Sequence, residues 1–167
     1  KMLNDGDGVP ANKKESTKYY RLASEKGHIS AMYFYANNLM EGKGTSVDKE
    51  EANKYYKLSA DKGHIKSMIC YADNLYNGNG ISCNKKEANR YYKMAADKGN
   101  DTGRSIYANH LLNGDGIHVN KQEGNRYLKA SADKGNIESM LNYGDRLFYG
   151  DGVPANKKEA NRYYKTS

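Results

Sequence analysis

Glycine turns that contain aspartate are the residues of this chain that most resemble a metal site. A Gly-x-Gly turn occurs five times, and in three of these turns the middle residue is Asp. A calcium loop of the EF-hand type needs oxygen ligands at alternate positions, followed by a distant Glu. Asp5 and Asp7 begin that spacing, but Val9 stands where the next oxygen ligand is required. The pattern therefore indicates structural turns, and we predict no metal site.

Histidine, cysteine and nucleophilic side chains are too scattered to predict catalysis. The chain has four histidines, His28, His64, His110 and His118. Their spacing matches no zinc motif, and the first two occupy equivalent positions of a repeat. No serine, threonine or cysteine stands beside a recognisable base or in an elbow motif. We therefore predict no catalytic residue and no cofactor, and we expect that the protein is not an enzyme.

The positive charge of the chain is spread along predicted helices and is not gathered into one run. A net charge of +7 makes a nucleic-acid or anionic-membrane surface worth testing. The cations alternate with acids three or four residues away, as in Glu87/Arg90 and Lys93/Asp97. No basic run exceeds two residues, so we expect solvated helix faces and do not expect nucleic acid as the partner. No apolar run approaches the roughly 18 residues that a membrane span requires.

A period of 36 residues organises the chain. Lys-Gly pairs recur at residues 26, 62, 98 and 134, and Gly-x-Gly turns begin at residues 6, 42, 78, 114 and 150. A fixed period of this length, with two helical segments in each repeat, predicts a helical solenoid. We assign a partial repeat at 1–27, repeats at 28–63, 64–99 and 100–135, and a truncated repeat at 136–167, all in one array over 1–167. We expect this array to be part of a longer protein, and its open ends allow end-to-end self-stacking.

Each repeat predicts two helices, which we name helix A and helix B in chain order. Helix B follows an Asn or Asp that has Glu three residues later, at 12/15, 48/51, 84/87, 120/123 and 156/159. In such a capping box the cap oxygen accepts an amide proton, and the Glu bonds the cap's own amide. Helix A is predicted to begin near Ile29, Ile65, Asp101 and Ile137, with Asn100 and Asn136 as caps. Residues 1–5 are predicted to be the end of an earlier helix A.

An apolar stripe on each helix A forms the predicted core. Its members stand at three- and four-residue steps, as in Met32, Tyr35, Ala36 and Leu39, and the set recurs with the period. Arg104 replaces Met in the third set, and we expect its stem to pack while its charge reaches water. The small residue after each Tyr allows close approach of a neighbouring helix.

The repeat resembles a known family. The pattern Tyr-Ala-x-x-Leu-x-x-Gly-x-Gly, followed by Asn/Asp-x-x-Glu-Ala-x-x-Tyr-Tyr-x-x-Ala-Ala-Asp-Lys-Gly, is similar to the SEL-one-like repeat (SLR), a relative of the tetratricopeptide repeat, and covers the whole chain. The resemblance implies an all-α fold, a right-handed α/α superhelical solenoid with helices A on its concave side. It also implies a scaffold or adaptor that binds a peptide or partner protein. Gly124 departs from the pattern by replacing Ala, which we expect to loosen the fourth helix B.

Tyrosine placement points to the same side of the helices. Thirteen of the 16 tyrosines fall at recurring positions, whereas Tyr33, Tyr76 and Tyr149 do not. These three stand on the helix A face opposite the core, at positions that face ligands in tetratricopeptide-type helices. We name the second, fifth, ninth, twelfth and thirteenth residues of each helix A the A-helix surface. From it we predict eleven partner-binding residues: Tyr33, Asn37, Lys66, Asp73, Tyr76, Asn77, Asn109, Asn113, Asp145, Phe148 and Tyr149.

Two interpretations of these residues stay open. The ninth-position residues, Asn37, Asp73, Asn109 and Asp145, form a polar ladder that can bond an extended backbone. Alternatively, they bond adjacent helices A or cap the next loop, and the aromatic rings pack against their neighbours. The surface has few cations besides Lys66, so it lacks a clamp for a terminal carboxylate. We therefore predict a mixed polar and aromatic partner segment with basic residues.

Two other functions are alternatives. Cysteine-rich relatives of this repeat are associated with β-lactam binding and resemble one another in a disulfide-linked pair within each repeat. Cys70 and Cys83 have no counterparts in the other repeats, which weakens that alternative. The second alternative is nucleic-acid binding through the basic edge of helices B. The compartment is left open, since the resemblance is compatible with the cytoplasm or the endoplasmic reticulum lumen.

Overall fold

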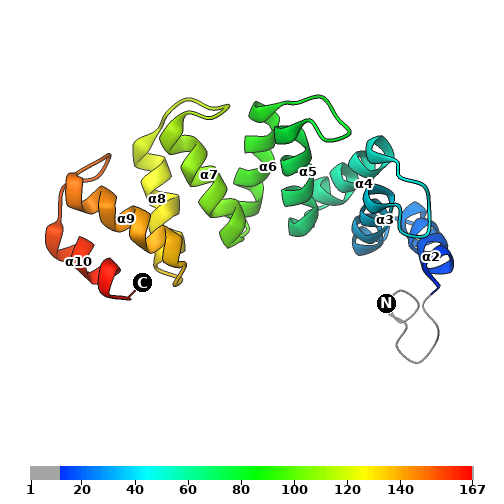
Figure 1. The fold of residues 1–167 in the computed structure, drawn as a ribbon, viewed down its shortest axis with the longest axis horizontal. Coiled ribbons are helices and arrows are strands. Elements are labelled where there is room, and N and C mark those ends of the chain that lie inside the picture. The colour runs from blue at the N-terminus through cyan, green and yellow to red at the C-terminus, as the bar shows by residue number, and fades with distance from the viewer. Residues whose placement is uncertain (1–11, 167) are drawn as a thin grey trace. The chain divides into compact units, whose positions relative to one another are not determined.

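The chain is all-α, as the repeat predicts. A computed structural model describes residues 12–166, which form nine α-helices and no strand (Figure 1). The helices are α2 (Lys13–Glu25), α3 (Ile29–Glu41), α4 (Lys49–Asp61), α5 (Ile65–Asn77), α6 (Lys85–Asp97), α7 (Asp101–Asn113), α8 (Lys121–Ala132), α9 (Ile137–Tyr149) and α10 (Lys157–Thr166). Helices A are α3, α5, α7 and α9, and they begin at the predicted residues. The helix end predicted at residues 1–5 and the loop residue Val9 lie outside the described residues.

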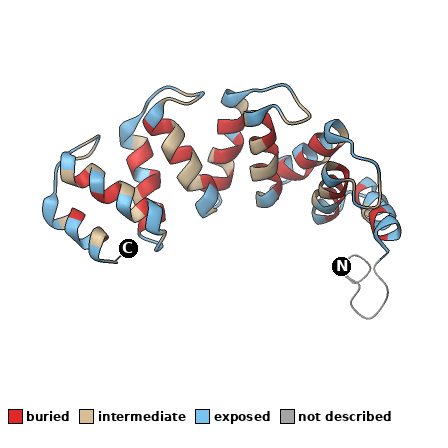
Figure 2. Cartoon of the chain, viewed as in Figure 1, coloured by how far each residue is buried: buried red, intermediate tan, exposed pale blue. Residues whose placement is uncertain are grey.

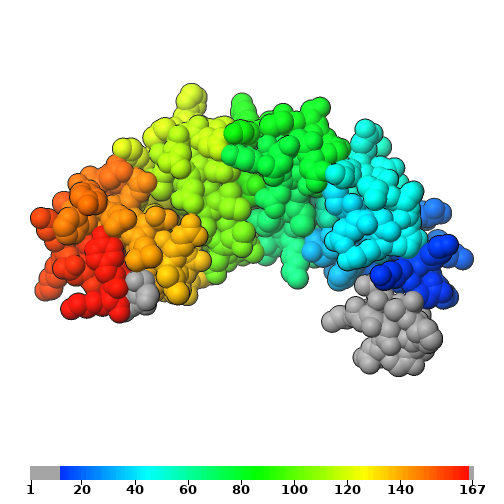
Figure 3. Space-filling model, in the orientation of Figure 1, coloured from blue at the N-terminus to red at the C-terminus, as the bar shows by residue number. Residues whose placement is uncertain are grey.

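Two compact units divide the chain, one spanning residues 1–84 and the other residues 85–167. In the first unit α3 packs on α2 and α4, and α4 packs on α5. In the second unit α6 to α10 pack in the same sequential way. Segments that follow one another in sequence therefore lie side by side within each unit, as the space-filling view shows (Figure 3). The single array over residues 1–167 stays a prediction.

Helix B begins where the capping pattern predicts. The cap oxygen accepts the amide proton of the Glu three residues later at 2.9–3.0 Å, in Asn12, Asp48, Asn120 and Asn156. The second half of the predicted capping box is wrong. The cap's own amide donates to the carbonyl of the recurring Leu of the preceding helix A, at 2.7–3.0 Å for Asp48, Asn84, Asn120 and Asn156. The loop folds the chain back over the end of helix A, so this carbonyl takes the place predicted for the Glu carboxylate.

Helix A is capped as predicted by Asn100 and Asn136, which accept the amide protons of Gly103 and Ser139 at 2.8 Å. His64 has the same role for α5, because its Nδ1 lies 3.3 Å from the Ser67 amide nitrogen. The sequence pattern does not predict this role for His64. An imidazole nitrogen is a less common cap than an Asn or Ser oxygen.

The predicted core is confirmed. Met32, Tyr35, Ala36 and Leu39 are buried, and buried residues lie along the helix sides that face neighbours (Figure 2). The recurring tyrosines of helices A and B meet edge to face at centroid distances of 4.9–5.3 Å, in Tyr35–Tyr55, Tyr107–Tyr127 and Tyr143–Tyr163. Such pairs stabilise a fold beyond the area that they bury. Arg104 extends to the Asp101 carboxylate at 2.9 Å, as expected for a packed stem with an outer charge.

The space beside Gly124 is filled by a side chain of the preceding helix A. A β-carbon at this buried glycine would lie 2.8 Å from Cγ of Leu112. Leu112 is buried, although its position belongs to the A-helix surface in the repeat pattern. The glycine therefore makes room for a leucine that the pattern places outside the core.

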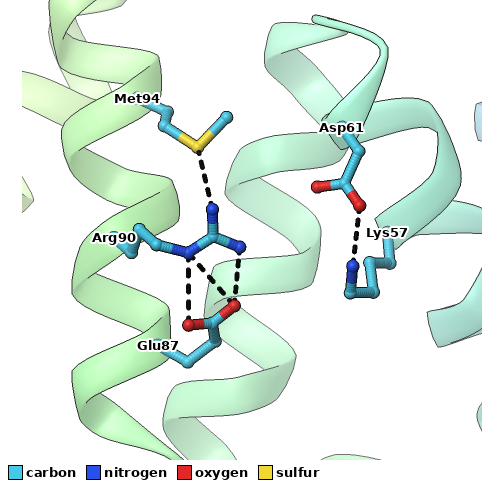
Figure 4. A network of polar contacts seen from close by, with 5 residues as sticks. All are labelled: Lys57, Asp61, Glu87, Arg90 and Met94. Atoms are coloured by element: carbon cyan, nitrogen blue, oxygen red, sulfur yellow. Dashed lines mark hydrogen bonds and ion pairs between the residues drawn. The ribbon is translucent and has the colours of Figure 1, made fainter.

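Charged pairs on the solvent side of helices B follow the predicted spacing. Arg90 donates to the Glu87 carboxylate at 2.7 Å, and Lys57 donates to Asp61 at 2.7 Å (Figure 4). Arg90 also reaches the Met94 sulfur at 3.8 Å. Exposed pairs of this kind contribute little stability, at most about 1 kcal/mol each. They neutralise much of the positive charge locally.

In the Gly-x-Gly turns that follow α3, α5, α7 and α9, the second glycine lies against the first residue of an earlier helix B. Its φ is between 69° and 74°, and a β-carbon there would lie 2.1–2.5 Å from that residue, in the pairs Gly44–Lys13, Gly80–Lys49, Gly116–Lys85 and Gly152–Lys121. Real β-carbons do not approach this closely. Glycine is therefore required at this position for two reasons. It tolerates the positive φ, and its lack of a β-carbon permits the close contact.

A buried hydrogen-bond network holds the same loop. The fifth residue of helix B donates to the carbonyl between the two glycines at 2.7–2.9 Å, in Thr17, Asn53, Asn89 and Asn125. A helix A side chain completes the network: Asn38 bonds Thr17 at 2.8 Å, Asn74 bonds Asn53 at 2.8 Å, and His110 bonds Asn89 at 2.6 Å. We name these groups the loop network. The repeat pattern does not predict the hydrogen bonds of the loop network.

The fourth copy of the loop network is incomplete. Arg146 takes the place of Asn38, Asn74 and His110, and its guanidinium pairs with the Asp151 carboxylate. Among the described residues, Oδ1 of Asn125 is the buried side-chain oxygen that has no hydrogen-bond partner. An unpaired buried acceptor costs free energy, so this copy stabilises its loop least.

We predict that Gly116→Ala lowers the free energy of unfolding by about 2–4 kcal/mol, because positive-φ strain and a backbone clash add. The matched control is Gly135→Ala in the same unit, where φ is 89° but a β-carbon would meet nothing within 4 Å. That control should cost about 1–2 kcal/mol from strain alone. Urea unfolding of both variants measures the difference, and equal losses would contradict the close approach.

His110 should make stability depend on pH. Burial lowers its pKa, with a further lowering from Lys85 and an opposing effect from Asp115. A histidine whose folded pKa is depressed stabilises the fold above its unfolded pKa near 6.5, and this contribution is lost as pH falls below that value. His110→Asn restores the residue of two other repeats. We predict a smaller drop in melting temperature between pH 7.5 and pH 5 for this variant than for the natural chain. An unchanged drop would contradict the contribution of His110 to this pH dependence.

Candidate partner-binding surface

None of the eleven predicted binding residues is buried. In the first unit α3 carries Tyr33 and Asn37, and α5 carries Lys66, Asp73, Tyr76 and Asn77. In the second unit α7 carries Asn109 and Asn113, and α9 carries Asp145, Phe148 and Tyr149. Side chains on one face of neighbouring helices A are thus accessible within each unit, while the recurring Tyr, Ala and Leu of the same helices are buried. Accessibility alone does not make them a binding site.

Two members of the polar ladder bond tyrosines of the following helix B. The Tyr56 hydroxyl donates to Oδ1 of Asn37 at 2.5 Å, and the Tyr164 hydroxyl donates to Oδ1 of Asp145 at 2.8 Å. In each pair the tyrosine follows its partner by 19 residues. Tyr56 is buried and Tyr164 is half-buried, and a tyrosine hydroxyl in such a place needs a hydrogen-bond partner. These two side chains therefore fasten helix A to helix B, which neither interpretation from the sequence included.

The same tyrosines remain protonated donors at neutral pH. Burial raises the pKa of Tyr164 to about 12, and its hydrogen bond to the Asp145 carboxylate adds to the increase. Burial also raises the pKa of Tyr56, with smaller contributions from Cys70, Tyr33 and Glu41. Both hydroxyls keep the proton that they donate to the ladder.

Asn109 differs from Asn37 and Asp145. The residue 19 positions later is Leu128, which has no hydroxyl. Asn109 is half-buried, and no hydrogen bond joins its side-chain amide to any residue from 12 to 166. The ladder therefore contains members that stabilise the fold and one whose amide is available.

Tyr33 belongs to an aromatic cluster of the first unit. Its ring lies 5.0 Å from His64, 5.4 Å from Phe34 and 6.2 Å from Tyr56, measured between centroids. Burial lowers the pKa of His64, and the nearby Lys66 ammonium lowers it further. Phe34 stacks on Tyr20 at 5.2 Å and remains 43% exposed. The sequence analysis missed Phe34 and His64, because these contacts join residues that no repeat pattern brings together.

On α9 the apolar side chains are open to solvent. Tyr149 is 77% exposed and Leu141 is 44% exposed. Phe148 contacts Tyr149 edge to face at 5.1 Å, and the Lys157 ammonium lies 5.1 Å from the Phe148 ring centre. Asp145 stands between Leu141 and Phe148 along the helix. An apolar surface beside a carboxylate is thus present on this helix.

Hollows in the surface lie elsewhere. A hollow of about 630 Å³ in the first unit is lined by Glu50 and Lys54 of α4, Tyr71 of α5 and Ile81 of the loop after α5. A smaller one of about 330 Å³ stands at the equivalent place one repeat earlier, beside Lys14, Lys18 and Thr45. These open hollows follow from the loop geometry and contain none of the eleven predicted residues. An extended peptide needs a surface with anchoring side chains and does not require a closed cavity.

The cysteines are unpaired thiols. Burial raises the pKa of Cys70 to about 11. Cys83 is exposed and lies 3.2 Å from the Tyr76 carbonyl oxygen. Within residues 12–166 no group of three or more His, Cys, Asp or Glu side chains has the geometry to hold a metal ion. No helix in the same part of the chain has the length and apolar character to cross a membrane.

These observations define a class of protein. Paired helices that recur every 36 residues, each packed on its sequence neighbours within a unit, are those of an α/α helical-repeat protein. The chain belongs to the Sel1 repeat family, whose model matches residues 1–28, 29–64, 67–100, 106–136 and 137–167. The predicted family and fold class are thereby confirmed. Repeats of this family generally mediate protein interactions.

Solved structures agree with this assignment. A protective antigen of uropathogenic Escherichia coli with an SLR fold is 26% identical and superposes with a TM-score of 0.95, over 99% of this chain and 36% of that one. A Sel1 repeat protein from Oxalobacter formigenes is also 26% identical, with a TM-score of 0.90 over 99% and 68%. Cysteine rich protein B of Helicobacter pylori, at 16% identity and a TM-score of 0.60 over 77% and 92%, shares the fold. The chain thus spans about a third of the length of the E. coli protein. No curated protein matches this sequence.

Proposed function

We propose that this protein is an interaction scaffold whose A-helix surface binds an extended polypeptide segment rich in basic and aromatic residues. The observation that carries the proposal is the exposure of Leu141 and Tyr149 on α9 beside the exposed Asp145. Tyrosine is a frequent energetic anchor of protein interfaces, and the exposed Leu141 adds apolar area beside it. The recurring core is already buried within each unit, so these side chains are not used by the described packing.

Charge favours a basic partner. In the first unit the A-helix surface carries Glu41, Asp73 and Lys66, and in the second unit it carries Glu138 and Asp145 and no Lys or Arg. The whole chain has a net charge of +7, so the acids of this surface are set apart from a basic remainder. Complementary charge increases the association rate and selects against acidic partners. This supports Lys or Arg side chains in the bound segment.

The two alternatives have less support. Many cations of helices B are paired within their own helix, as in Lys93–Asp97 at 2.6 Å and Lys129–Asp133 at 2.6 Å. Nucleic-acid binding depends on cations that are available to neutralise phosphates. The β-lactam alternative rests on relatives with a disulfide in each repeat, and both cysteines here are thiols.

The test uses a random dodecamer peptide library selected on the purified chain. We predict that selected peptides are enriched in Lys, Arg and aromatic residues, and that Leu141→Ser with Tyr149→Ser weakens their binding at least about tenfold, or roughly 1.4 kcal/mol. The matched control is Lys86→Ser with Arg126→Ser, two exposed changes on helices B that should alter binding less than about twofold.

Isothermal titration with the best synthetic peptide measures each affinity, and circular dichroism confirms folding. Loss of binding in the helix B control alone would contradict the proposed surface. So would a library from which no peptide is enriched.

A further inference from the structure

Tyrosines of helices B divide the polar ladder into used and available members. In the first unit the Tyr56 hydroxyl occupies Oδ1 of Asn37, and in the second unit the Tyr164 hydroxyl occupies Oδ1 of Asp145. Both bonds join positions 19 residues apart. A side chain held in this way is fixed in orientation, and part of its hydrogen-bonding capacity is taken. The tyrosine at this position of helix B therefore determines what the ladder residue can offer a ligand.

In one repeat Leu128 stands where the other repeats have this tyrosine. Leu128 is 1% exposed, so it fills its place in the core but offers no hydroxyl. Asn109, 19 residues earlier, is half-buried, and its amide has no hydrogen bond within residues 12–166. A primary amide has two donors and an acceptor with two lone pairs. Leaving these groups unpaired near the protein surface is costly unless water or a ligand satisfies them.

The neighbour of Asn109 one turn earlier on α7 is a small residue. Ser105 stands one turn earlier on α7, at the position that carries Tyr33, Ile69 and Leu141 in the other repeats. Its hydroxyl lies 3.3 Å from that of Ser139 on α9 and 3.4 Å from that of Ser131 on α8, and both of these serines are buried. A serine at this position covers less of the helix surface beside Asn109 than the Tyr, Ile or Leu of the other repeats.

We infer that Asn109 binds the main chain of the partner segment and that the substitution of tyrosine by Leu128 makes it available to do so. The inference rests on the proposed function and names one position of the same surface. The side-chain amide presents a C=O and an N–H together, which matches the N–H and C=O of one extended peptide residue. Glu138 and Asp145 on α9 of the same unit are exposed carboxylates, which would attract a basic side chain of the ligand.

The experiment restores the missing hydroxyl. The probe is the best peptide from the dodecamer selection, and the variants are Leu128→Tyr, Asn109→Ala and the control Leu128→Phe. Leu128→Tyr places a donor on Asn109 as in the other repeats, while Leu128→Phe adds the same ring without the hydroxyl. We predict that Leu128→Tyr and Asn109→Ala each weaken the peptide at least about tenfold and that Leu128→Phe changes it less than about threefold.

A second measurement does not depend on the folding of Leu128→Tyr. Each peptide residue is N-methylated in turn, which removes one main-chain donor. One position should lose at least about tenfold in affinity for the natural chain and much less for Asn109→Ala, since that variant has already lost the acceptor. Equal losses for both proteins at every position would overturn the inference.

The outcomes separate the two claims. Peptide binding that is lost in Leu141→Ser with Tyr149→Ser but is unaffected by Asn109→Ala would overturn the inference and leave the proposed surface in place. Binding that survives all of these changes would contradict both claims.

Discussion

The close approach between a loop glycine and the start of an earlier helix B is the contact on which the fold depends. A β-carbon on Gly44 would lie 2.1 Å from the Lys13 carbonyl oxygen, and one on Gly80 would lie 2.3 Å from Cβ of Lys49. Because the loop sits this deep, its carbonyl accepts a hydrogen bond from the buried Thr17 or Asn53. The loop then brings the backbone amide of the next helix B cap to the carbonyl of the recurring Leu of helix A, and the amide donates a hydrogen bond to that carbonyl.

This arrangement separates the residues that build the fold from those that can vary. Glycine, Asn and Tyr at fixed positions join each helix A to its neighbouring helices B within a unit. The remaining face of helix A carries Tyr33 in one repeat and Ser105 or Leu141 in others, with different exposures. The boundary between the core and the variable face of helix A is not fixed. Leu112 belongs to the variable face in the repeat pattern, but it is buried because Gly124 leaves room for it. Function is therefore expected where a repeat departs from the common pattern.

Much of the fold could be predicted because its determinants are local or periodic. The start of α7 follows from Asn100, and the burial of Tyr35 and Leu39 follows from their spacing along the helix. The loop network could not be predicted in the same way. Asn53 resembles an ordinary polar residue of a helix B, and only the folded loop brings the Asn79 carbonyl, 26 residues later, within 2.9 Å.

The candidate surface was predicted as a set of positions, and their individual roles required contacts. Asn37, Asn109 and Asp145 are alike in sequence register. They differ because Tyr56 and Tyr164 provide hydroxyls and Leu128 does not. That distinction depends on pairs 19 residues apart in neighbouring helices, which the single-helix pattern does not show. Tyr33 likewise required His64 and Phe34 to be placed before its packing was evident.

Nuclear magnetic resonance of the isotope-labelled chain, titrated with the selected peptide, tests the central claim most directly. The account predicts that the largest shift changes occur in α7 and α9, including the side-chain amide signals of Asn109, with little change at the starts of α6 and α8. Shift changes confined to the basic edge of helices B, around Lys86 and Arg126, would contradict it.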